Sequence, residues 1–589
     1  MEKEIRKGNN AATSALVFVT LTSMASAQTN IPGGRPSPTD AGLVMFPSSI
    51  VPVPAPTGLN HNAEPLSPQS RNRILNLQIT LLSPNEGELQ RRVDSGERLT
   101  ADDLKKYQGD PNAANNVASW LRSQGFKNVS IAPDKTAIFS QATADQVQKT
   151  LKVKMESVVV DNNRVVSAVT PPQLPAEFAA SVSGIQGLQP WVQAQRRAVS
   201  RMEYEQRMQS EVPPLNSSPQ GLLPNAAAKG SQTIIPGKAA LAASALKVSD
   251  VLHRYNAHTI STSGRGQNIA VLIDTFPNRS DLRKFWNLNN IKINDQQVRF
   301  VDVKAPGARL PIPTGEESLD VEWTSGIAPG AIITVYASGS LNYVDLDRAL
   351  RRILDDASKP GGPQHVSISL GLREDAVPEA EIRTQHSIYL RLRGLGVNVF
   401  VSSGDAGSNP DLTGHGRSPD THVEYPASDP DVISVGGTSL GTDGKGPETC
   451  WKDSGGGVSN RSMDLLRRPA WQPEYATISS PYRLVPDVSG VADPSPGGSV
   501  ILNGKETPFG GTSWSTPIWA GFSALLAENI AIKGRSMGFI GQQLYQSEIR
   551  RTFRDIDGTT NGAYKCGPGW NPVTGLGAPD ISRISSLLK

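Results

Sequence analysis

The stretch Val399-Phe400-Val401-Ser402-Ser403-Gly404-Asp405-Ala406-Gly407-Ser408 joins an apolar run to an acidic residue between glycines. A short apolar run bounded by turn residues is typical of a buried strand. In doubly wound sheets, functional groups lie at the carboxyl ends of the strands. Asp405 is therefore a candidate site residue. The other interpretation is a turn aspartate that satisfies its own backbone.

Similar apolar runs recur through the second half of the chain, at 269–273, 332–336, 366–370 and 397–401. Helical patterns separate them, at 318–326, 344–354 and 379–392. Buried strands that alternate with helices favour a parallel sheet covered by helices on both faces. We therefore predict an α/β fold with a doubly wound parallel sheet over residues 241–589.

A second patterned unit precedes this domain, within residues 68–200. It contains, in order, a strand-like run at 74–82, helical spacing of Val117, Trp120 and Leu121, alternation at 137–139 and a helical run at 144–151. Both periodicities occur in one short unit, which predicts a small α+β domain.

The remaining segments have the composition of signals and linkers. A charged start, a short apolar run and Ala25-Ser26-Ala27 predict a secretory signal peptide over 1–27, with a disordered tail as the other interpretation. We therefore expect a secreted protein. Residues 28–67 are predicted to be a disordered linker, and the Pro- and Ala-rich residues 201–240 a flexible linker open to proteolysis.

The composition excludes several classes of partner. Lys and Arg number 58 and Asp and Glu 55 among the 589 residues, and this net charge of +3 gives no reason to expect nucleic acid or an anionic membrane. No apolar run approaches the ~20 residues of a membrane helix. Two cysteines, Cys450 and Cys566, exclude a disulfide scaffold, and the sequence leaves open whether they pair.

A candidate nucleophile lies in Gly510-Gly511-Thr512-Ser513-Trp514-Ser515-Thr516-Pro517, ahead of an apolar helix. Glycines let a substrate approach the backbone, and a helix N-terminus favours developing negative charge. A helix-capping Ser or Thr is the other interpretation. Serine nucleophiles usually need a histidine base, and none of the seven histidines has a His-Gly-Thr context. A catalytic Ser513 would therefore need a carboxylate base.

A pair of acidic residues is suitably spaced to supply one. Glu316 and Asp320 are four residues apart at the start of a helical pattern, so they share one helical face. Two close carboxylates push their pKa values apart. Acidic residues that merely complement the helix dipole are the other interpretation.

Together these motifs resemble one family, the sedolisins or serine-carboxyl peptidases. The matches are, in chain order, Glu316 and Asp320 before Ala328-Pro329-Gly330, then Ser403 to Gly407, then Gly511 to Ser513. Shorter matches lie at 425–428, 435–438, 454–457 and 485–488. The resemblance implies a subtilisin-like fold for the parallel-sheet domain and an activation prodomain for residues 68–200.

The resemblance also implies a role for each residue. Ser513 would attack the peptide carbonyl, Glu316 would take its proton, Asp320 would orient Glu316, and Asp405 would help form the oxyanion hole. An aspartate donates a hydrogen bond only while protonated. We therefore expect an endopeptidase that works in acid on protein or peptide substrates.

The prodomain implies a zymogen. We expect it to act as an intramolecular inhibitor and chaperone, and the precursor to cut itself at low pH within residues 201–240. Protonation of carboxylates at the prodomain interface would weaken that interface. The protein is expected to be a monomer.

The family's calcium site resembles residues near the C-terminus. The resemblance assigns one Ca²⁺ to Asp555, the carbonyl of Ile556, the carbonyls of Gly567 and Gly569, and Asn571. Asn571 stands where the family has an aspartate. Calcium accepts amide oxygens but loses affinity when ligand charge is removed.

Two positions around the expected active site also depart from kumamolisin-like members. Asp274 and Leu370 stand where those members have a glutamate and a tryptophan that extend the triad's hydrogen bonds. Because Leu370 has no polar side-chain atom, we expect a shortened or rebuilt outer network.

Three other functions stay open at this point. A tripeptidyl exopeptidase would have the same fold with one end of the cleft blocked. A catalytically silent binding protein would not need all of Glu316, Asp320, Asp405 and Ser513. A glycosidase would use the carboxylate pair alone, although placement on one helix suits a relay better than a pair flanking a sugar.

Overall fold

The computed structural model describes residues 37–38, 42–52, 64–160, 163–210, 244–414, 416–441, 444–461, 463–473 and 478–588. The predicted signal peptide, residues 1–27, lies outside the described residues. Among the described residues, no helix combines the length and the apolar character needed to cross a membrane.

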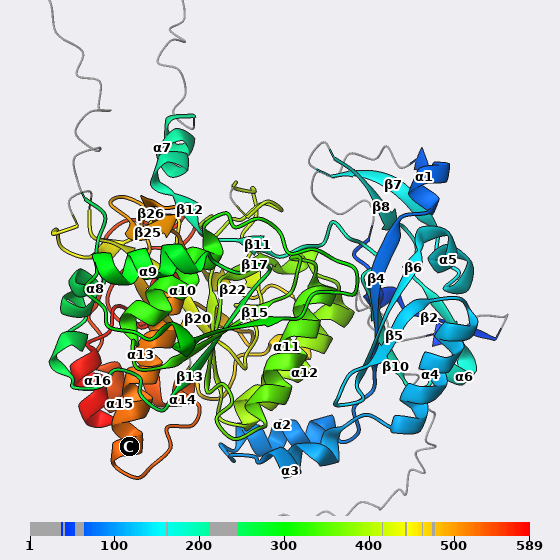
Figure 1. Cartoon of the computed structure of the whole chain (residues 1–589), viewed down its shortest axis with the longest axis horizontal. Helices are drawn as coiled ribbons and strands as arrows, with labels where there is room; N and C mark the ends of the chain where they lie inside the picture. Colours follow the sequence, from blue (N-terminus) through cyan, green and yellow to red (C-terminus); the bar gives the residue numbers. More distant parts are fainter. Residues whose placement is uncertain are drawn as a thin grey trace, which may run out of the picture.

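The larger domain is built on an eight-stranded sheet (Figure 1). The strand order is β14 (Val298–Asp302), β15 (Ile332–Ala337), β13 (Asn268–Ile273), β16 (His365–Ile368), β18 (Asn398–Ser402), β20 (Ile433–Ser439) and β21 (Thr449–Cys450), with β24 (Val488–Val491) also on β20. Every neighbouring pair is parallel except β20 with β21. The predicted parallel sheet is confirmed.

Helices cover the sheet in two groups. The helices α10 (Glu316–Ile327) and α13 (Thr512–Ile532) pack against each other, and α13 also contacts β16, β18 and β20. The helices α11 (Tyr343–Ala357) and α12 (Glu379–Gly394) lie on the side that faces the N-terminal domain (Figure 1). The helix α13 is buried on nearly all sides, because its sequence is apolar around its whole circumference.

The run at 366–370 is not one strand. It divides at Ser369, between β16 and the antiparallel strand β17 (Leu370–Arg373), which leaves the main sheet. The Ser369 hydroxyl donates to Asp320 Oδ1 at 2.6 Å, which fixes this turn over helix α10. The apolar pattern alone could not indicate the division.

The N-terminal domain has the predicted α+β architecture. Its antiparallel sheet has the order β10 (Val182–Gln186), β4 (Ile74–Leu81), β6 (Ala137–Thr143), β5 (Lys127–Ile131). The helix α4 (Pro111–Ser123) packs on β5 and β6, and its first turn is set by Pro111 and by the side chain of Asp110, which accepts from Asn112 N at 2.9 Å. The helix α5 (Ala144–Thr150) follows β6 directly.

Both predicted linkers contain folded parts, and the prediction of disorder is wrong there. Within 28–67, the strand β2 (Leu43–Met45) pairs with β9 (Gln173–Pro175), and Phe46 is fully buried. The apolar run 43–46 explains this packing, because it can remove apolar surface from water. Within 201–240, helix α7 (Arg201–Ser210) is formed, and residues 211–240 lie outside the described residues.

Candidate active site

The four residues expected to act on a peptide bond converge at one edge of the sheet. Glu316 and Asp320 lie in the first two turns of α10, Ser513 lies in the first turn of α13, and Asp405 lies in the turn after β18. All four are buried, with exposed fractions from 0% to 7%. Because α10 packs along α13, residues almost 200 positions apart face the same space.

Ser513 has the setting of a nucleophile rather than a cap. The N-cap of α13 is Gly511, with a φ of 108°, and no side chain caps the helix. The Ser513 hydroxyl lies 3.4 Å from the Ser369 carbonyl oxygen and also interacts with the Glu316 carboxyl group, whose pKa it lowers. The capping interpretation of Ser513 is therefore wrong.

Burial controls the protonation of the acidic pair. Burial raises the pKa of Glu316 to about 8, against the opposing effect of Ser513. Burial and the charge of Glu316 raise the pKa of Asp320 well above its ordinary value. Glu317, not this pair, accepts from the Gly315 backbone N–H at 3.0 Å, so the helix start is satisfied by another residue. Neither member of the pair is therefore occupied in capping the helix start.

Ser369 is a site residue that the sequence reasoning missed. Its hydroxyl donates to Asp320 and lies 3.4 Å from the Ser513 carbonyl oxygen, so it links the two helices of the site. Its position at the carboxyl end of β16 is the sequence feature that could have identified Ser369 as a site residue.

Asp405 is not a turn aspartate that satisfies its own loop. Its Oδ1 accepts from the Thr512 backbone N–H at 2.8 Å and from the Thr512 hydroxyl at 2.7 Å. Burial raises the pKa of Asp405 to about 7, although these two hydrogen bonds oppose the shift. Among the described residues, Oδ2 has no hydrogen-bond partner. A neutral Asp405 can therefore donate from Oδ2.

A segment of the chain itself passes through this site. The strand β11 (Gln195–Arg196) pairs antiparallel with β17, and β12 (Val199–Ser200) pairs antiparallel with β26 (Lys505–Gly510) (Figure 1). Between these two strands, the backbone N–H of Ala198 donates to Glu316 Oε2 at 2.6 Å. A peptide that adds a strand to an exposed edge is a common mode of substrate binding.

The backbone carbonyl group of Arg197 lies next to Gly511 in the same site. A Cβ atom built on Gly511 would lie 1.9 Å from the Arg197 carbonyl oxygen and 2.4 Å from Asp405 Oδ2. Both oxygens therefore flank the same glycine, at the start of the helix that presents Ser513. The Arg197–Ala198 peptide bond has its carbonyl beside Asp405 and its nitrogen on Glu316.

Asp274 and Leu370 contact this segment rather than the triad. Asp274 accepts from the Arg196 guanidinium at 2.6 Å, and Leu370 pairs with Arg196 through the backbone. The outer network around Asp320 is formed by Ser369 instead.

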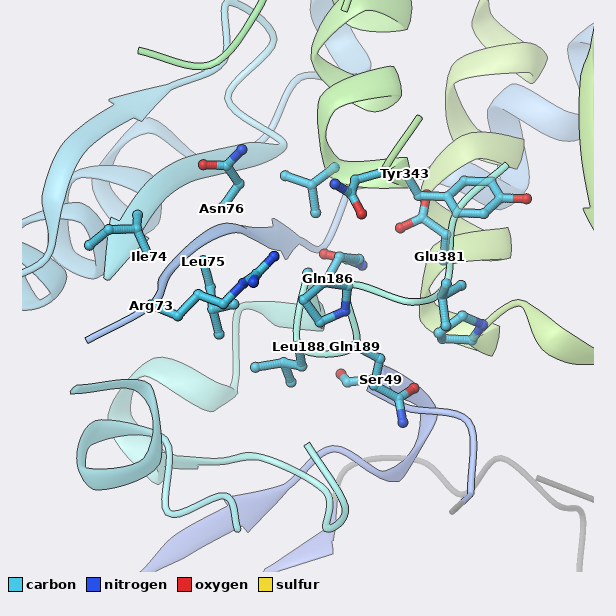
Figure 2. Close-up of a pocket in the computed structure, with 16 residues that line it drawn as sticks. Ser49, Arg73, Ile74, Leu75, Asn76, Gln186, Leu188, Gln189, Tyr343 and Glu381 are labelled. Carbon is cyan, nitrogen blue, oxygen red and sulfur yellow. The ribbon is translucent and has the colours of Figure 1, made fainter. Parts of the chain in front are cut away.

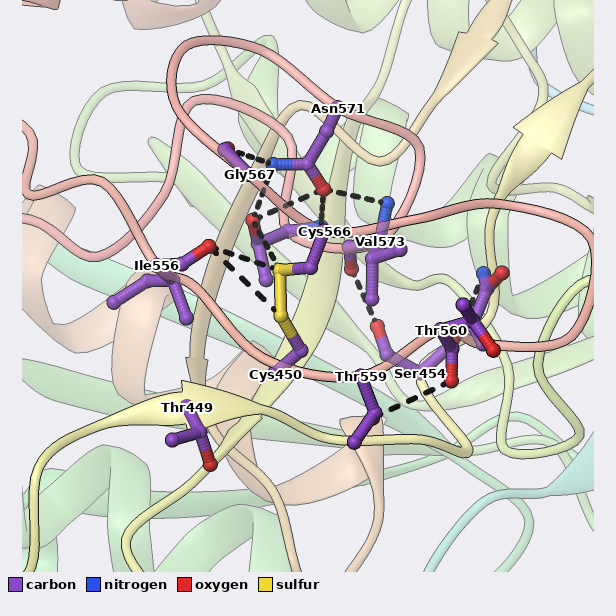
Figure 3. Close-up of a disulfide and its surroundings, with 12 residues drawn as sticks. Thr449, Cys450, Ser454, Ile556, Thr559, Thr560, Cys566, Gly567, Asn571 and Val573 are labelled. Carbon is purple, nitrogen blue, oxygen red and sulfur yellow. Dashed lines mark hydrogen bonds between the residues drawn. A yellow bond between two sulfur atoms is a disulfide. The ribbon is translucent and has the colours of Figure 1, made fainter.

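The expected calcium ligands do not fit a cation as they are arranged. The Asn571 side-chain N–H group donates to the Gly567 carbonyl at 2.9 Å, and its Oδ1 accepts from two backbone N–H groups at 3.0 Å (Figure 3). These acceptor bonds fix the amide orientation, because the opposite orientation would set N–H against N–H. Asp555 Oδ1 accepts from the Gly569 backbone N–H at 2.7 Å. Asn571 thus presents a donor where a calcium ligand must present an oxygen.

A disulfide holds the same loop. Cys450 and Cys566, with Cα atoms 6.5 Å apart, join positions 116 residues apart in sequence (Figure 3). The sequence had left this pairing open.

The described histidines serve other purposes. His386, Asp429 and Asp431 form the group among the described residues whose geometry could hold a metal ion. Burial alone would lower the pKa of His386, but the carboxylates of Asp429 and Asp431 raise it to about 9. A protonated imidazole pairs with carboxylates and does not bind a metal. The Ser513 hydroxyl contacts the Ser369 carbonyl oxygen and the Glu316 carboxyl group, whereas His61 and His415 lie outside the described residues.

Ion pairs and hydrogen bonds join the N-terminal domain to α11 and α12. Asp134 pairs with Arg351 at 2.7 Å, and Asp94 pairs with Arg393 at 3.1 Å. The pocket in Figure 2 lies at this interface, between residues such as Gln186 on one side and Tyr343 and Glu381 on the other. None of the four expected catalytic residues lines it.

Two family descriptions match the chain. Residues 62–190 match the pro-kumamolisin activation domain, and residues 312–559 match the subtilase family. These ranges correspond to the α+β domain and to most of the parallel-sheet domain.

The chain is also similar to named relatives. It is 34% identical to kumamolisin from Bacillus sp. (strain MN-32), over 47% of this chain and 51% of kumamolisin. It is 25% identical to sedolisin from Pseudomonas sp. (strain 101), over 80% of this chain and 78% of sedolisin. It is 29% identical to human tripeptidyl-peptidase 1, over 56% of this chain and 61% of that protein. The matched region thus spans only about half of kumamolisin.

A solved structure agrees in fold. Pseudomonas sedolisin, a serine-carboxyl proteinase complexed with two molecules of pseudo-iodotyrostatin, superposes with a TM-score of 0.51 at 24% identity, over 58% of this chain and 98% of that one. Residues 62–190 therefore form a pro-kumamolisin activation domain ahead of a subtilisin-like domain, and the chain is similar to the sedolisin family of serine-carboxyl peptidases.

Proposed function

We propose that this chain is the secreted precursor of a serine-carboxyl endopeptidase that works in acid. The observation that carries the proposal is the Arg197–Ala198 peptide bond, which lies among Glu316, Asp405 and the helix start that presents Ser513. The α+β domain acts as the intramolecular inhibitor, and residues 1–27 direct export.

The geometry supports an acyl-transfer mechanism. Glu316 takes the proton of Ser513 while the Ser513 Oγ bonds to the peptide carbonyl carbon. The carbonyl oxygen becomes an oxyanion, to which a protonated Asp405 donates from Oδ2. Glu316 then gives its proton to the leaving nitrogen, and the C–N bond breaks. Water, deprotonated by Glu316, releases the acid product from the serine ester.

The protonation state of Asp405 sets the upper pH limit of this mechanism. Asp405 donates only below its raised pKa of about 7, so the oxyanion hole fails above that pH. Glu316 and Asp320 titrate as a pair, and Glu316 is a base when the pair has lost one of its two protons.

The path of the bound segment favours an endopeptidase over a tripeptidyl exopeptidase. Upstream of the Arg197–Ala198 bond, β11 pairs with β17, and Gln193 forms a bridge with Asn342. Five residues before the bond therefore lie along the peptidase domain, whereas a tripeptidyl exopeptidase must end its cleft after three. A peptide with a blocked amino terminus should be cut as well as its free form, and cleavage of the free form alone would favour the exopeptidase.

In place of the expected calcium ion, we propose that side chains of the protein hold the C-terminal loop. Asn571 and the disulfide of Cys566 hold the C-terminal loop without a bound cation. Protein and peptide chains are the proposed substrates, and a monomer is the proposed state.

Casein hydrolysis from about pH 2 to about pH 8, by the wild type and by Ser513→Ala, tests the reaction class. We expect activity below about pH 7 and none from the variant. A profile that peaks near pH 8 and collapses below about pH 5 would contradict the proposal, and equal activity of the variant would exclude Ser513 as the nucleophile.

A further inference from the structure

We propose that Glu381 and Asp347 form a proton-dependent latch between the two domains. A proton shared by these two carboxyl groups holds the N-terminal domain on α11 and α12 in weak acid, and the loss of that proton toward neutral pH loosens the contact. The latch concerns the docking of the domains, so it does not depend on the proposed peptidase chemistry.

Both acids lie on the face of the larger domain that the N-terminal domain covers. Asp347 lies in α11 and Glu381 in the first turn of α12, and their exposed fractions are 0% and 2%. The strand β4 contacts α11, β10 contacts α12, and Glu381 lines the interface pocket in Figure 2. A Cβ atom built on Gly184 of β10 would lie 2.6 Å from Ala380 Cβ, so this strand passes very close to α12. The docked domain therefore separates the two acids from water.

Amide groups determine which of the two acids is charged. Gln78 Nε2 of β4 donates to Asp347 Oδ2 at 2.8 Å, and Gln385 Nε2 of α12 donates to Asp347 Oδ1 at 2.9 Å. The Glu381 carboxyl group is also hydrogen-bonded to that of Asp347. Because a carboxylate only accepts hydrogen bonds, one of the two groups must hold a proton. Both oxygens of Asp347 accept from amides, so Glu381 is the acid that holds it.

Burial stabilises the shared proton. Burial and the charge of Asp347 raise the pKa of Glu381 well above its ordinary value, and burial also raises the pKa of Asp347. When the N-terminal domain leaves, water reaches both carboxyl groups and Gln78 no longer donates to Asp347. The desolvation that raised the two pKa values then ends, so the released pair loses its proton at a lower pH than the docked pair.

Two arginines face the pair. Against the effect of burial, the charge of Arg351 on α11 lowers the pKa of both acids, but its guanidinium also pairs with Asp134 at 2.7 Å, so its charge is shared. Arg73 of the N-terminal domain lines the same pocket as Glu381, but it is exposed, so water screens its charge. Three buried tyrosines also interact with Glu381, and burial raises their pKa values well above the ordinary value, so they stay neutral: Tyr343, Tyr389 and Tyr425.

Two further titratable groups lie at the same interface. Asp345 on α11 accepts from Asn76 Nδ2 of β4 at 3.2 Å, and burial raises its pKa, so it acts in the same direction as the latch. His386 on α12 is hydrogen-bonded to Gln90 at 3.3 Å, but its pKa of about 9 keeps it charged in weak acid and at neutral pH. Asp345 is therefore the group from which the latch must be distinguished by experiment.

The shared proton links docking to pH. A carboxyl pKa that is raised in the docked state stabilises docking below the ordinary value of 4.5, and this stabilisation is lost as the pH rises through the raised pKa. Burial raises the pKa of Asp405 to about 7, so Asp405 is neutral over much of the same acid range. The latch therefore holds the N-terminal domain in place under the conditions in which the site has its hydrogen-bond donor.

A single reactive cysteine measures docking in the full-length precursor. Val344 of α11 packs on Ala137 and Phe139 of the N-terminal domain and is 2% exposed. The chain has two cysteines, which form a disulfide, so Val344→Cys adds the one free thiol. In a Ser513→Ala precursor, which should stay uncut, this thiol reacts with a labelling reagent when the domains separate.

The dependence of labelling on pH tests the latch. We expect the rate, corrected for the thiolate fraction of a free thiol, to rise at least about tenfold from about pH 5 to about pH 8, because one pKa unit of linkage corresponds to a factor of ten. Glu381→Gln keeps an N–H donor toward Asp347 at every pH, so its rate should change less than about twofold over this range. Asp345→Asn, the matched control at the same interface, should keep the rise. A rate that does not change with pH in the parent precursor, or a rise that persists in Glu381→Gln, would overturn the proposal.

Infrared spectra of the Ser513→Ala precursor detect the proton directly. At about pH 7, Glu381→Gln should remove intensity from the carbonyl band of protonated carboxyl groups, whereas Glu548→Gln, which changes an exposed and therefore charged carboxylate, should leave the band unchanged. An unchanged band in Glu381→Gln would contradict the latch. Because both measurements use an inactive precursor, their failure would leave the peptidase function standing, and a wild type that does not hydrolyse casein would remove that function while the latch stands.

Discussion

In the proposed mechanism, Asp405 is the residue that restricts activity to acid. It is buried, its Oδ1 accepts hydrogen bonds from Thr512, and its Oδ2 flanks Gly511 together with the Arg197 carbonyl oxygen. Because burial raises its pKa to about 7, the group is neutral below that pH and charged above it. The hydrogen bond to an oxyanion is therefore present below about pH 7 and is lost above it.

Two substitutions of Asp405 distinguish the effect of its hydrogen bond to the oxyanion from the effect of its protonation with pH. Asp405→Ala should lower kcat about 100- to 1,000-fold, the loss expected when an oxyanion donor is removed. Asp405→Asn keeps an N–H donor at every pH, so it should lose the decline in activity near pH 7 that the wild type shows. The measurement is kcat against pH for both variants. An Asp405→Asn profile with the wild-type decline would show that another group titrates there.

Asn571 decides whether the C-terminal loop needs calcium. Its N–H group already bridges to the Gly567 carbonyl. We expect the Tm of the wild type to be the same with a chelator and with calcium. Asn571→Asp should create a loop whose Tm rises with calcium, because a carboxylate restores charge to the ligand set. A wild-type Tm that falls on chelation would restore the calcium site.

At the scale of elements, the long strands and helices could be predicted from the sequence, whereas the point where the chain leaves the main sheet could not. The strands β13, β15 and β18 and the helix α12 lie within a few residues of the expected runs, because continuous apolar patterns report burial on both faces. The division between β16 and β17 was missed, since it depends on a hydrogen bond from Ser369 to a residue 49 positions away.

Ser369 therefore has a testable positioning role. Removing its hydroxyl leaves a buried oxygen of Asp320 without its donor, which should cost about 1–3 kcal/mol of stability. Because this hydrogen bond lowers the pKa of Asp320, Ser369→Ala should raise the pKa of the acidic pair and move the acid limb of the kcat profile to higher pH. Ser369→Thr, which keeps a hydroxyl, serves as the control. A lower Tm with an unmoved acid limb would make the role merely structural.

At the scale of the whole molecule, the four catalytic candidates could be found from short motifs, whereas the occupant of the cleft could not. Nothing in the local pattern around Arg197 indicates that it reaches Glu424, which lies 227 positions further along the chain. Such a contact depends on how two domains dock. The folded residues 42–52 were missed because their partner strand, β9, lies about 130 positions further along the same domain.

The docked domains predict a pH-dependent release. Burial alone would raise the pKa of Asp134, but the Arg351 guanidinium and Thr136 hold it below its ordinary value of 3.8. A depressed carboxylate pKa stabilises the interface above that ordinary value, and this stabilisation is lost as the pH falls through the lowered pKa. The prodomain contact of Asp134 with Arg351 is thus weakened in strong acid.

Asp134→Asn tests this contact in the full-length precursor. It leaves Arg351 buried without its partner, so self-processing should become faster at about pH 5 to 6 and less dependent on pH. The control is Asp145→Asn, which changes a carboxylate that pairs with an exposed lysine inside the prodomain. A processing rate of Asp134→Asn that follows the wild type at every pH would remove Asp134 from the release mechanism.

The most direct test of the central claim is the intact mass of the purified precursor during incubation at about pH 4, for the wild type and for Ser513→Ala. If Ser513, Glu316, Asp320 and Asp405 act on the chain's own bound segment, the wild type should lose its N-terminal domain as a separate mass while Ser513→Ala stays at full length. Processing of Ser513→Ala at the wild-type rate would contradict the account.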